Sequence, residues 1–115
     1  MGKINSRQKG ARGERMFAQL LRCHGYEAER GCQHAGGKDS PDVKSNMAGV
    51  HWEVKFVEKL NLYDAIEQSK KDAGENEMPL VAHKRSRTEW FVTMSFNDWI
   101  KLFKAYEESE DKTNE

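Results

Sequence analysis

The stretch from 40 to 57 limits the possible folds more than any other segment, because it contains the most regular strand pattern in the chain. Polar and apolar side chains alternate along its second half, in the order His51, Trp52, Glu53, Val54, Lys55, Phe56. Successive side chains of a strand point to opposite faces, so the alternation places Glu53 and Lys55 on one face and the apolar set on the other. We therefore predict a strand over 50–57.

An aspartate shortly before this strand extends the pattern. Asp42 opens a predicted strand over 43–47, and the Ala-Gly pair at 48–49 is expected to form the turn that follows. A hairpin would bring Asp42 beside Glu53, so that two carboxylates and the Lys55 ammonium converge. Such a set suits Mg²⁺, which takes one or two carboxylates and leaves room for a phosphate. The simpler interpretation is a solvated polar face of a half-buried sheet.

Length and charge indicate one small domain with a basic start. The chain has 115 residues, enough for one modest core. No segment approaches the roughly 18 consecutive apolar residues of a membrane helix or resembles a signal peptide. The formal charge is zero, but 107–115 holds five acidic residues and one lysine, a net −4, so 1–106 carries +4. The basic residues of 1–22 are the ones expected to meet nucleic acid.

This basic start divides into two segments. Residues 1–11 are predicted to form a flexible basic arm, either disordered or ordered along a phosphate backbone. Residues 12–24 are predicted to form a helix with a basic stripe that includes Arg12 and Arg15. Glu14 leans toward the packed face of that helix. It is either a partner of the helix dipole or a carboxylate aimed at the metal site.

The remaining segments alternate between strand and helix patterns. Further strands are expected over 26–33, 80–83 and 90–94, and further helices over 61–73 and 96–106. Asn61 and Ser95 are predicted to cap these two helices. Gln68 either faces the active centre or is solvated. The aromatic stripe of the last helix is either core or a dimer face, and the charged segment 107–115 is expected to form an acidic disordered tail.

The two cysteines, Cys23 and Cys32, are expected to be reduced and structural. A zinc site would have to add His24 and His34 to them. The spacing of these four residues fits no standard zinc module.

The order of the predicted elements resembles the αβββαβ core of the PD-(D/E)XK nuclease superfamily. The small size is similar to that of the archaeal-type Holliday junction resolvases and the phage-encoded nucleases akin to them. Segment 9–15 looks like the opening of that family, and segments 40–43 and 53–55 look like its catalytic half. The resemblance spans about 9–94. It implies an α/β, restriction-endonuclease-like fold with a mixed central sheet flanked by helices, and a single nuclease domain over 12–106.

The resemblance also implies functional roles. The expected catalytic residues are Glu14, Asp42, Glu53 and Lys55. Mg²⁺, for which Mn²⁺ would substitute, is expected on Asp42, Glu53 and the Val54 carbonyl, with Glu14 binding directly or through water. DNA contacts are expected from Lys9, Arg12, Arg15 and Arg30, and Gln68 is expected to support the site from outside the ligand set. The implied activity is hydrolysis of DNA phosphodiester bonds, most specifically in four-way junctions during recombination or repair, by a homodimer.

One departure and two alternatives stay open. Archaeal members place a serine in the glycine-rich loop between the first two strands, whereas this loop reads His34-Ala-Gly-Gly37 and the nearest serine is Ser40. The alternatives are a general, repair-type or restriction-type DNA nuclease of the same fold, and a DNA-binding module without catalysis. We expect a cytoplasmic protein with no membrane contact, in a bacterial or phage-infected cell.

Overall fold

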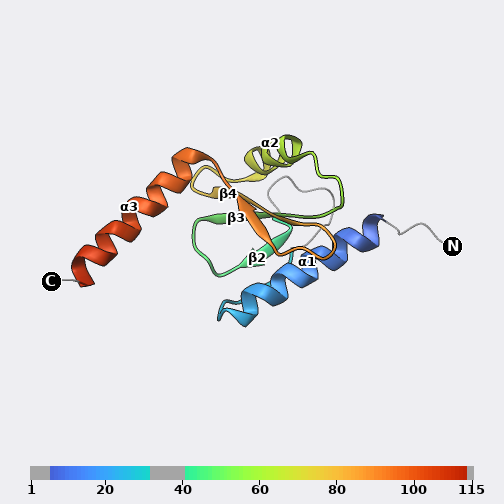
Figure 1. The fold of residues 1–115 in the computed structure, drawn as a ribbon, viewed down its shortest axis with the longest axis horizontal. Coiled ribbons are helices and arrows are strands. Elements are labelled where there is room, and N and C mark those ends of the chain that lie inside the picture. The colour runs from blue at the N-terminus through green and yellow to red at the C-terminus, as the bar shows by residue number, and fades with distance from the viewer. Residues whose placement is uncertain (1–5, 32–40, 114–115) are drawn as a thin grey trace.

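The computed structural model describes residues 6–31 and 41–113, which form helices on both sides of a five-stranded sheet (Figure 1). The elements are α1 (Ser6–Cys23), β1 (Ala28–Arg30), β2 (Val43–Ser45), β3 (Val50–Phe56), α2 (Leu62–Asp72), β4 (Met78–Lys84), β5 (Phe91–Thr93) and α3 (Phe96–Thr113). This order confirms the predicted αβββαβ core, followed by one more strand and one more helix. The glycine-rich loop, Cys32 and Ser40 lie outside the described residues.

The strands follow one another across the sheet in the order β1-β2-β3-β4-β5. All neighbours are antiparallel except β3 and β4, which are parallel and are joined by α2 as a crossover helix. The sheet is therefore mixed, as predicted, and β3 lies at its centre. Gly49, in the expected turn before β3, has a φ of +77°, a conformation that glycine adopts without a steric penalty.

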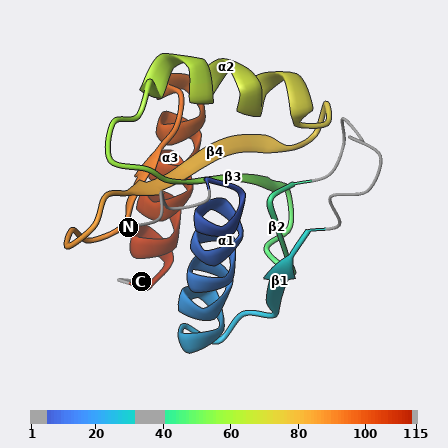
Figure 2. The same cartoon turned by 90° about the vertical axis from the view of Figure 1, so that its right-hand side faces the viewer.

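The two faces of β3 are both covered, which differs from the simpler expectation of a solvated polar face. Figure 2 shows α1 against one face of the sheet and α2 against the other. Trp52 and Val54 pack under α1, and Phe17 of α1 meets the Trp52 ring at 4.7 Å. On the opposite face, His51 is fully buried and Glu53 is only 6% exposed. The alternation was correct, but a crossover helix on this face covers His51 and Glu53, while the Lys55 side chain stays 35% exposed.

The predicted boundaries of the terminal segments are wrong over part of their length. Helix α1 begins at Ser6, so 6–11 is helical rather than part of a flexible arm. Lys9 anchors this first part, because its ammonium pairs with Glu58 at 3.1 Å. At the other end α3 continues to Thr113, so 107–113 is helical. Glutamate and lysine favour helix, and extending a helix that has already started costs little, although these residues bury no apolar surface.

The predicted helix caps are confirmed. The Asn61 side chain accepts a hydrogen bond from the Asp64 amide at 3.1 Å, and the Ser95 hydroxyl accepts one from the Asp98 amide at 3.1 Å. Helix α3 then runs away from the sheet (Figure 1) and leaves its aromatic stripe exposed. Among the described residues, no helix is long and apolar enough to cross a membrane.

We expect Gly13→Ala to lower the free energy of unfolding by about 1–3 kcal/mol, because α1 lies too close to β3 for a side chain there. A Cβ on Gly13 would lie 2.5 Å from the Cβ of Phe56, which cannot rotate away. Gly10→Ala is the matched control in the same helix, since a Cβ there meets nothing within 4 Å. It should stabilise by about 0.5–1 kcal/mol. Urea unfolding measures both, and equal effects would contradict this packing.

Candidate active site

Asp42 lies just before β2, at the open end of the β2–β3 hairpin, and is held there by two hydrogen bonds to the central strand. Its amide donates to the Trp52 carbonyl at 2.9 Å, and its carboxylate accepts from the Val54 amide at 2.8 Å. The side chain thus satisfies a backbone donor of β3, which fixes the carboxylate beside the strand that carries Glu53. The predicted hairpin and the approach of Asp42 to this strand are confirmed.

Gly31, which the sequence analysis did not single out, makes this placement possible. Its amide donates to the Asp42 carbonyl at 2.8 Å, continuing the pairing of β1 with β2. A Cβ on Gly31 would overlap the Pro41 carbonyl oxygen. Only glycine allows β1 to approach the Pro41–Asp42 backbone so closely.

The predicted catalytic residues line one cavity of about 260 Å³, which we call the site cavity. It opens where the N-terminal half of α1 crosses the end of β3. Its walls are formed by Lys9, Gly10, Glu14, Asp42, Glu53, Val54, Lys55, Phe56 and Val57. Side chains from α1, β3 and the segment before β2 therefore meet, although 39 sequence positions separate Glu14 from Glu53.

Burial and charge strongly perturb Glu53. Its carboxylate lies 3.7 Å from the Lys55 ammonium. Desolvation, and then repulsion from Asp42, raise the pKa of Glu53 to about 7, and the nearby Lys55 offsets only part of this increase. A carboxylate in these surroundings is short of positive charge, which is the electrostatic condition that a bound cation relieves.

Glu14 is directed toward the site but has a partner of its own. Its carboxylate accepts a hydrogen bond from the Arg30 guanidinium at 2.8 Å. Burial raises the pKa of Glu14, and the charge of Asp42 adds to this rise, while Arg30 and Lys55 oppose it. Arg30, for which a DNA contact stays a prediction, forms this ion pair and keeps its side chain 37% exposed.

The donor set fits Mg²⁺ better than a metal that needs many protein ligands. No group of three or more His, Cys, Asp or Glu side chains within 6–31 and 41–113 is arranged to hold a metal ion. Mg²⁺ commonly uses one or two carboxylates and fills its other positions with water and phosphate oxygens. Asp42 and Glu53 supply two carboxylates that repel each other, so these residues fit such an ion.

The other predicted residues differ in how close they lie to this cavity. Lys9 lines the site cavity. The Arg12 guanidinium lies 5.7 Å from the ring centroid of Phe56, which also lines that cavity. Arg15 is exposed on α1. Gln68 donates to Asp72 at 2.7 Å and lines a neighbouring cavity of about 320 Å³ together with Lys55.

Two acidic residues that the sequence analysis missed influence the site. The charge of Asp72 contributes to the raised pKa of Glu53. Asp72 lies four positions after Gln68 on α2, so helical spacing places the two side chains on one face and could have identified Asp72 from the sequence. Glu58 accepts hydrogen bonds from the Ser86 amide at 2.8 Å and the Ser86 hydroxyl at 2.9 Å, and it pairs with Lys9. No local pattern connects positions 58 and 86.

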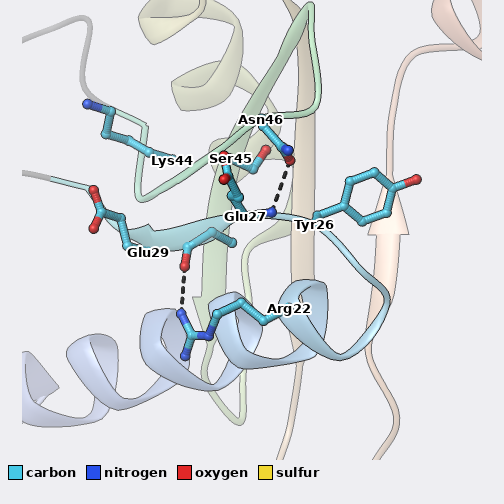
Figure 3. A pocket seen from close by; sticks show the side chains of 8 residues that line it. Arg22, Tyr26, Glu27, Glu29, Lys44, Ser45 and Asn46 are labelled. Carbon is cyan, nitrogen blue, oxygen red and sulfur yellow. Dashed lines mark hydrogen bonds between the residues drawn. The ribbon is translucent and has the colours of Figure 1, made fainter.

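A larger cavity of about 610 Å³ lies at the β1–β2 edge and contains none of the predicted catalytic residues (Figure 3). The side chains drawn and labelled there are Arg22, Tyr26, Glu27, Glu29, Lys44, Ser45 and Asn46. Arg22 already donates to the Ala28 carbonyl at 2.6 Å, and the acidic and basic side chains are balanced. Size alone therefore does not identify the functional site.

Among solved structures, the chain is similar to Hjc, a Holliday junction resolvase from the archaeal hyperthermophile Archaeoglobus fulgidus. The two share 30% sequence identity, the match covers 75% of this chain and 72% of Hjc, and the TM-score is 0.57. The chain belongs to the Hjc family. The match confirms the restriction-endonuclease-like fold and the expected relation to archaeal-type resolvases. No protein-family model matches the chain, and a search of curated proteins found no match.

We expect the metal-free protein to lose stability between about pH 4.5 and 7, because the fold favours the protonated form of Glu53. Its pKa rises from an ordinary value of 4.5 to about 7, so this contribution is complete below 4.5 and is lost as pH approaches 7. Urea unfolding in EDTA should show this decline, and Glu53→Gln should flatten most of it. At pH 8, Mg²⁺ should raise the Tm of the wild type but not that of Glu53→Gln. An undiminished decline in the variant would contradict the assignment to Glu53.

Proposed function

We propose that this protein is a metal-dependent endonuclease that hydrolyses phosphodiester bonds in DNA and resolves Holliday junctions. The observation that carries the proposal is the site cavity, where Asp42, Glu53 and Lys55 converge in a chain of the Hjc family. Two carboxylates and an ammonium at one end of a central strand match the needs of metal-assisted phosphate hydrolysis. We place it in the cytoplasm of a bacterial or phage-infected cell, with a role in recombination or repair.

Asp42 and Glu53 would hold Mg²⁺ or Mn²⁺, together with the Val54 carbonyl, and Glu14 would act through water because Arg30 already engages its carboxylate. Bound Mg²⁺ supplies Lewis-acid chemistry at the scissile phosphate and lowers the pKa of a coordinated water. The Asp42 carboxylate keeps its orientation because the Val54 amide donates to it.

Lys55 and the basic residues of α1 would act on the DNA itself. The Lys55 ammonium lies beside Glu53, where it would orient the attacking water or stabilise negative charge that develops on the phosphate. Lys9 lines the same cavity and Arg12 flanks it, so both would contact backbone phosphates without reading bases. The two roles differ: loss of Lys55 slows the chemistry, whereas loss of Arg12 weakens binding.

A general DNA nuclease of this fold is the second candidate, because it would need the same site. The two differ in the shape of DNA they prefer. Cleavage of a four-way junction compared with a linear duplex of the same sequence, at equal protein and Mg²⁺ concentrations, separates them. Preference for the duplex would favour the general nuclease.

We also propose a homodimer assembled through α3. Symmetric cleavage of a junction needs two active sites related by a two-fold axis, and one chain supplies one site. Phe96, Trp99, Leu102, Phe103 and Tyr106 are 38–70% exposed and follow one another along α3. An apolar stripe of this length on a soluble chain favours contact with a second copy.

Asp42→Asn and Glu53→Gln should each reduce cleavage by several orders of magnitude while leaving junction binding unchanged or improved. Each change removes a charge that holds the metal and repels the DNA backbone, with little change in shape. Single-turnover cleavage in Mg²⁺ and binding in EDTA measure the two effects. Glu75→Gln is the matched control, because it neutralises an exposed carboxylate outside the site cavity.

Lys55→Ala should behave differently, since it removes a positive charge: cleavage falls and affinity does not rise. Cutting at the wild-type rate by both carboxamide variants would show that the site is wrongly placed. If the wild type cleaved DNA as fast in excess EDTA as in Mg²⁺, metal dependence would be disproved. Junction binding by the wild type without cutting in any divalent metal would favour the binding-module alternative.

Trp99→Lys combined with Phe103→Lys should convert the dimer to a monomer, because two charges would then have to be buried in the interface. Sedimentation at micromolar concentration should give twice the chain mass for the wild type and the chain mass for the double variant. Tyr63→Lys is the matched control, since Tyr63 is an aromatic residue on α2 with 80% exposure. A wild-type monomer that still cuts both strands of a junction together would contradict the dimer.

A further inference from the structure

The site cavity adjoins two further cavities along the C-terminal end of β3. The neighbouring cavity of about 320 Å³ lies between the segment after β3 and α2, and the next, of about 470 Å³, lies against the loop between β4 and β5. Val57 lines all three, and Lys59 lines the second and third. The three cavities therefore lie side by side between the carboxylates and the β4–β5 loop.

The third cavity, which we call the hairpin cleft, is predominantly basic. Its charged and aromatic walls are formed by Glu58, Lys59, His83, Lys84, Arg85 and Phe91. Desolvation lowers the pKa of His83, which favours its neutral form, so Lys59, Lys84 and Arg85 supply the positive charge. Glu58 is the acidic residue among these lining residues. The sequence analysis assigned no role to the basic β4–β5 loop.

The single carboxylate of the hairpin cleft is already engaged. Glu58 accepts from the Ser86 amide and hydroxyl and pairs with Lys9, and these contacts lower its pKa to about 2. The Glu58 carboxylate is therefore neutralised in part by Lys9 of α1, and its hydrogen bonds from Ser86 hold the β4–β5 loop in place. The remaining cations of the cleft keep their charge available for another anion.

Cations also gather where the cleft meets the site cavity. Lys9, Arg12 and Lys84, from α1 and β4, lie 4.9, 5.7 and 5.6 Å from the Phe56 ring centroid. Three like charges on one ring repel one another, so a polyanion that passes between them would be bound favourably. Phe91 adds an aromatic surface, 53% exposed, with its ring stacked on His83 at 6.1 Å.

We propose that the hairpin cleft binds the DNA strand that leads away from the scissile phosphate, with backbone phosphates against Lys59 and Arg85 and a base against Phe91. This inference rests on the proposed nuclease function, because the site cavity fixes where the strand starts. DNA is favoured over an acidic protein segment because the cleft lies beside the carboxylate site and shares Val57 with it. Aromatic surfaces beside a basic groove bind unpaired bases by stacking, so a base unstacked near the scissile phosphate would find such a surface on Phe91.

The test is the salt dependence of junction binding, measured in EDTA so that no cutting occurs. Each phosphate contact contributes about −0.9 to the slope of log K against log salt concentration. Lys59→Gln with Arg85→Gln should therefore reduce the steepness by about 2, and should weaken binding at least tenfold at low salt. Lys70→Gln with Lys71→Gln is the matched control on α2, where the same charge change should leave the slope unaltered. Phe91→Ala should weaken binding about tenfold without changing the slope.

Further measurements distinguish the possible failures. Single-turnover cleavage at saturating protein should stay within twofold of wild type in the Lys59/Arg85 variant, because neither residue touches the carboxylates. A slope equal to wild type would overturn the hairpin cleft as a DNA site while leaving the nuclease proposal intact. A change in sedimentation instead of DNA affinity would overturn it in favour of a protein contact. Failure of the wild type itself to bind or cut DNA would refute the underlying function.

Discussion

The hydrogen bond between the Asp42 carboxylate and the Val54 amide connects the fold to the chemistry. At this point of the sheet an acidic side chain, rather than a neighbouring strand's carbonyl, accepts from the backbone of β3. Because a side chain takes the place of a strand here, the end of β3 can border the site cavity, and the Asp42 carboxylate places a negative charge at the edge of that cavity. The close approach of β1 at Gly31 supports the same corner from behind. Backbone pairing and ligand placement therefore depend on one another here.

Burial then converts an ordinary pair of strand carboxylates into an electrostatically strained site. With α1 on one face and α2 on the other, Glu53 is held away from water and close to Asp42. A single ammonium compensates incompletely, because desolvation and repulsion both disfavour the ionised form. The fold thus retains unfavourable charge where function needs a cation, a pattern that is common at active sites.

The sequence predicted those parts of the structure that depend on local spacing. Alternation along β3, the caps at Asn61 and Ser95, and the hairpin that carries Asp42 all follow from neighbouring residues. Contacts between distant segments were not predictable in this way: the ion pair of Glu14 with Arg30, or the three contacts of Glu58. The polar face of β3 is covered because the crossover helix α2 packs against it. Periodicity within one strand does not specify where that helix packs. The helical structure of 6–11 and 107–113 was not predicted, because a charged segment with few apolar residues was expected to be disordered.

The projection of α3 has a consequence for how the molecule behaves in an electric field. The acidic residues of 107–111 sit at one end of a particle with a longest dimension of 61 Å, and the basic start of α1 lies toward the other end (Figure 1). A formal charge of zero therefore coexists with a large dipole moment. Near a polyanion a single chain experiences a torque before it experiences contact, so it rotates its basic end forward as it diffuses. Encounters become pre-oriented, while the neutral total limits indiscriminate attraction to other charged surfaces.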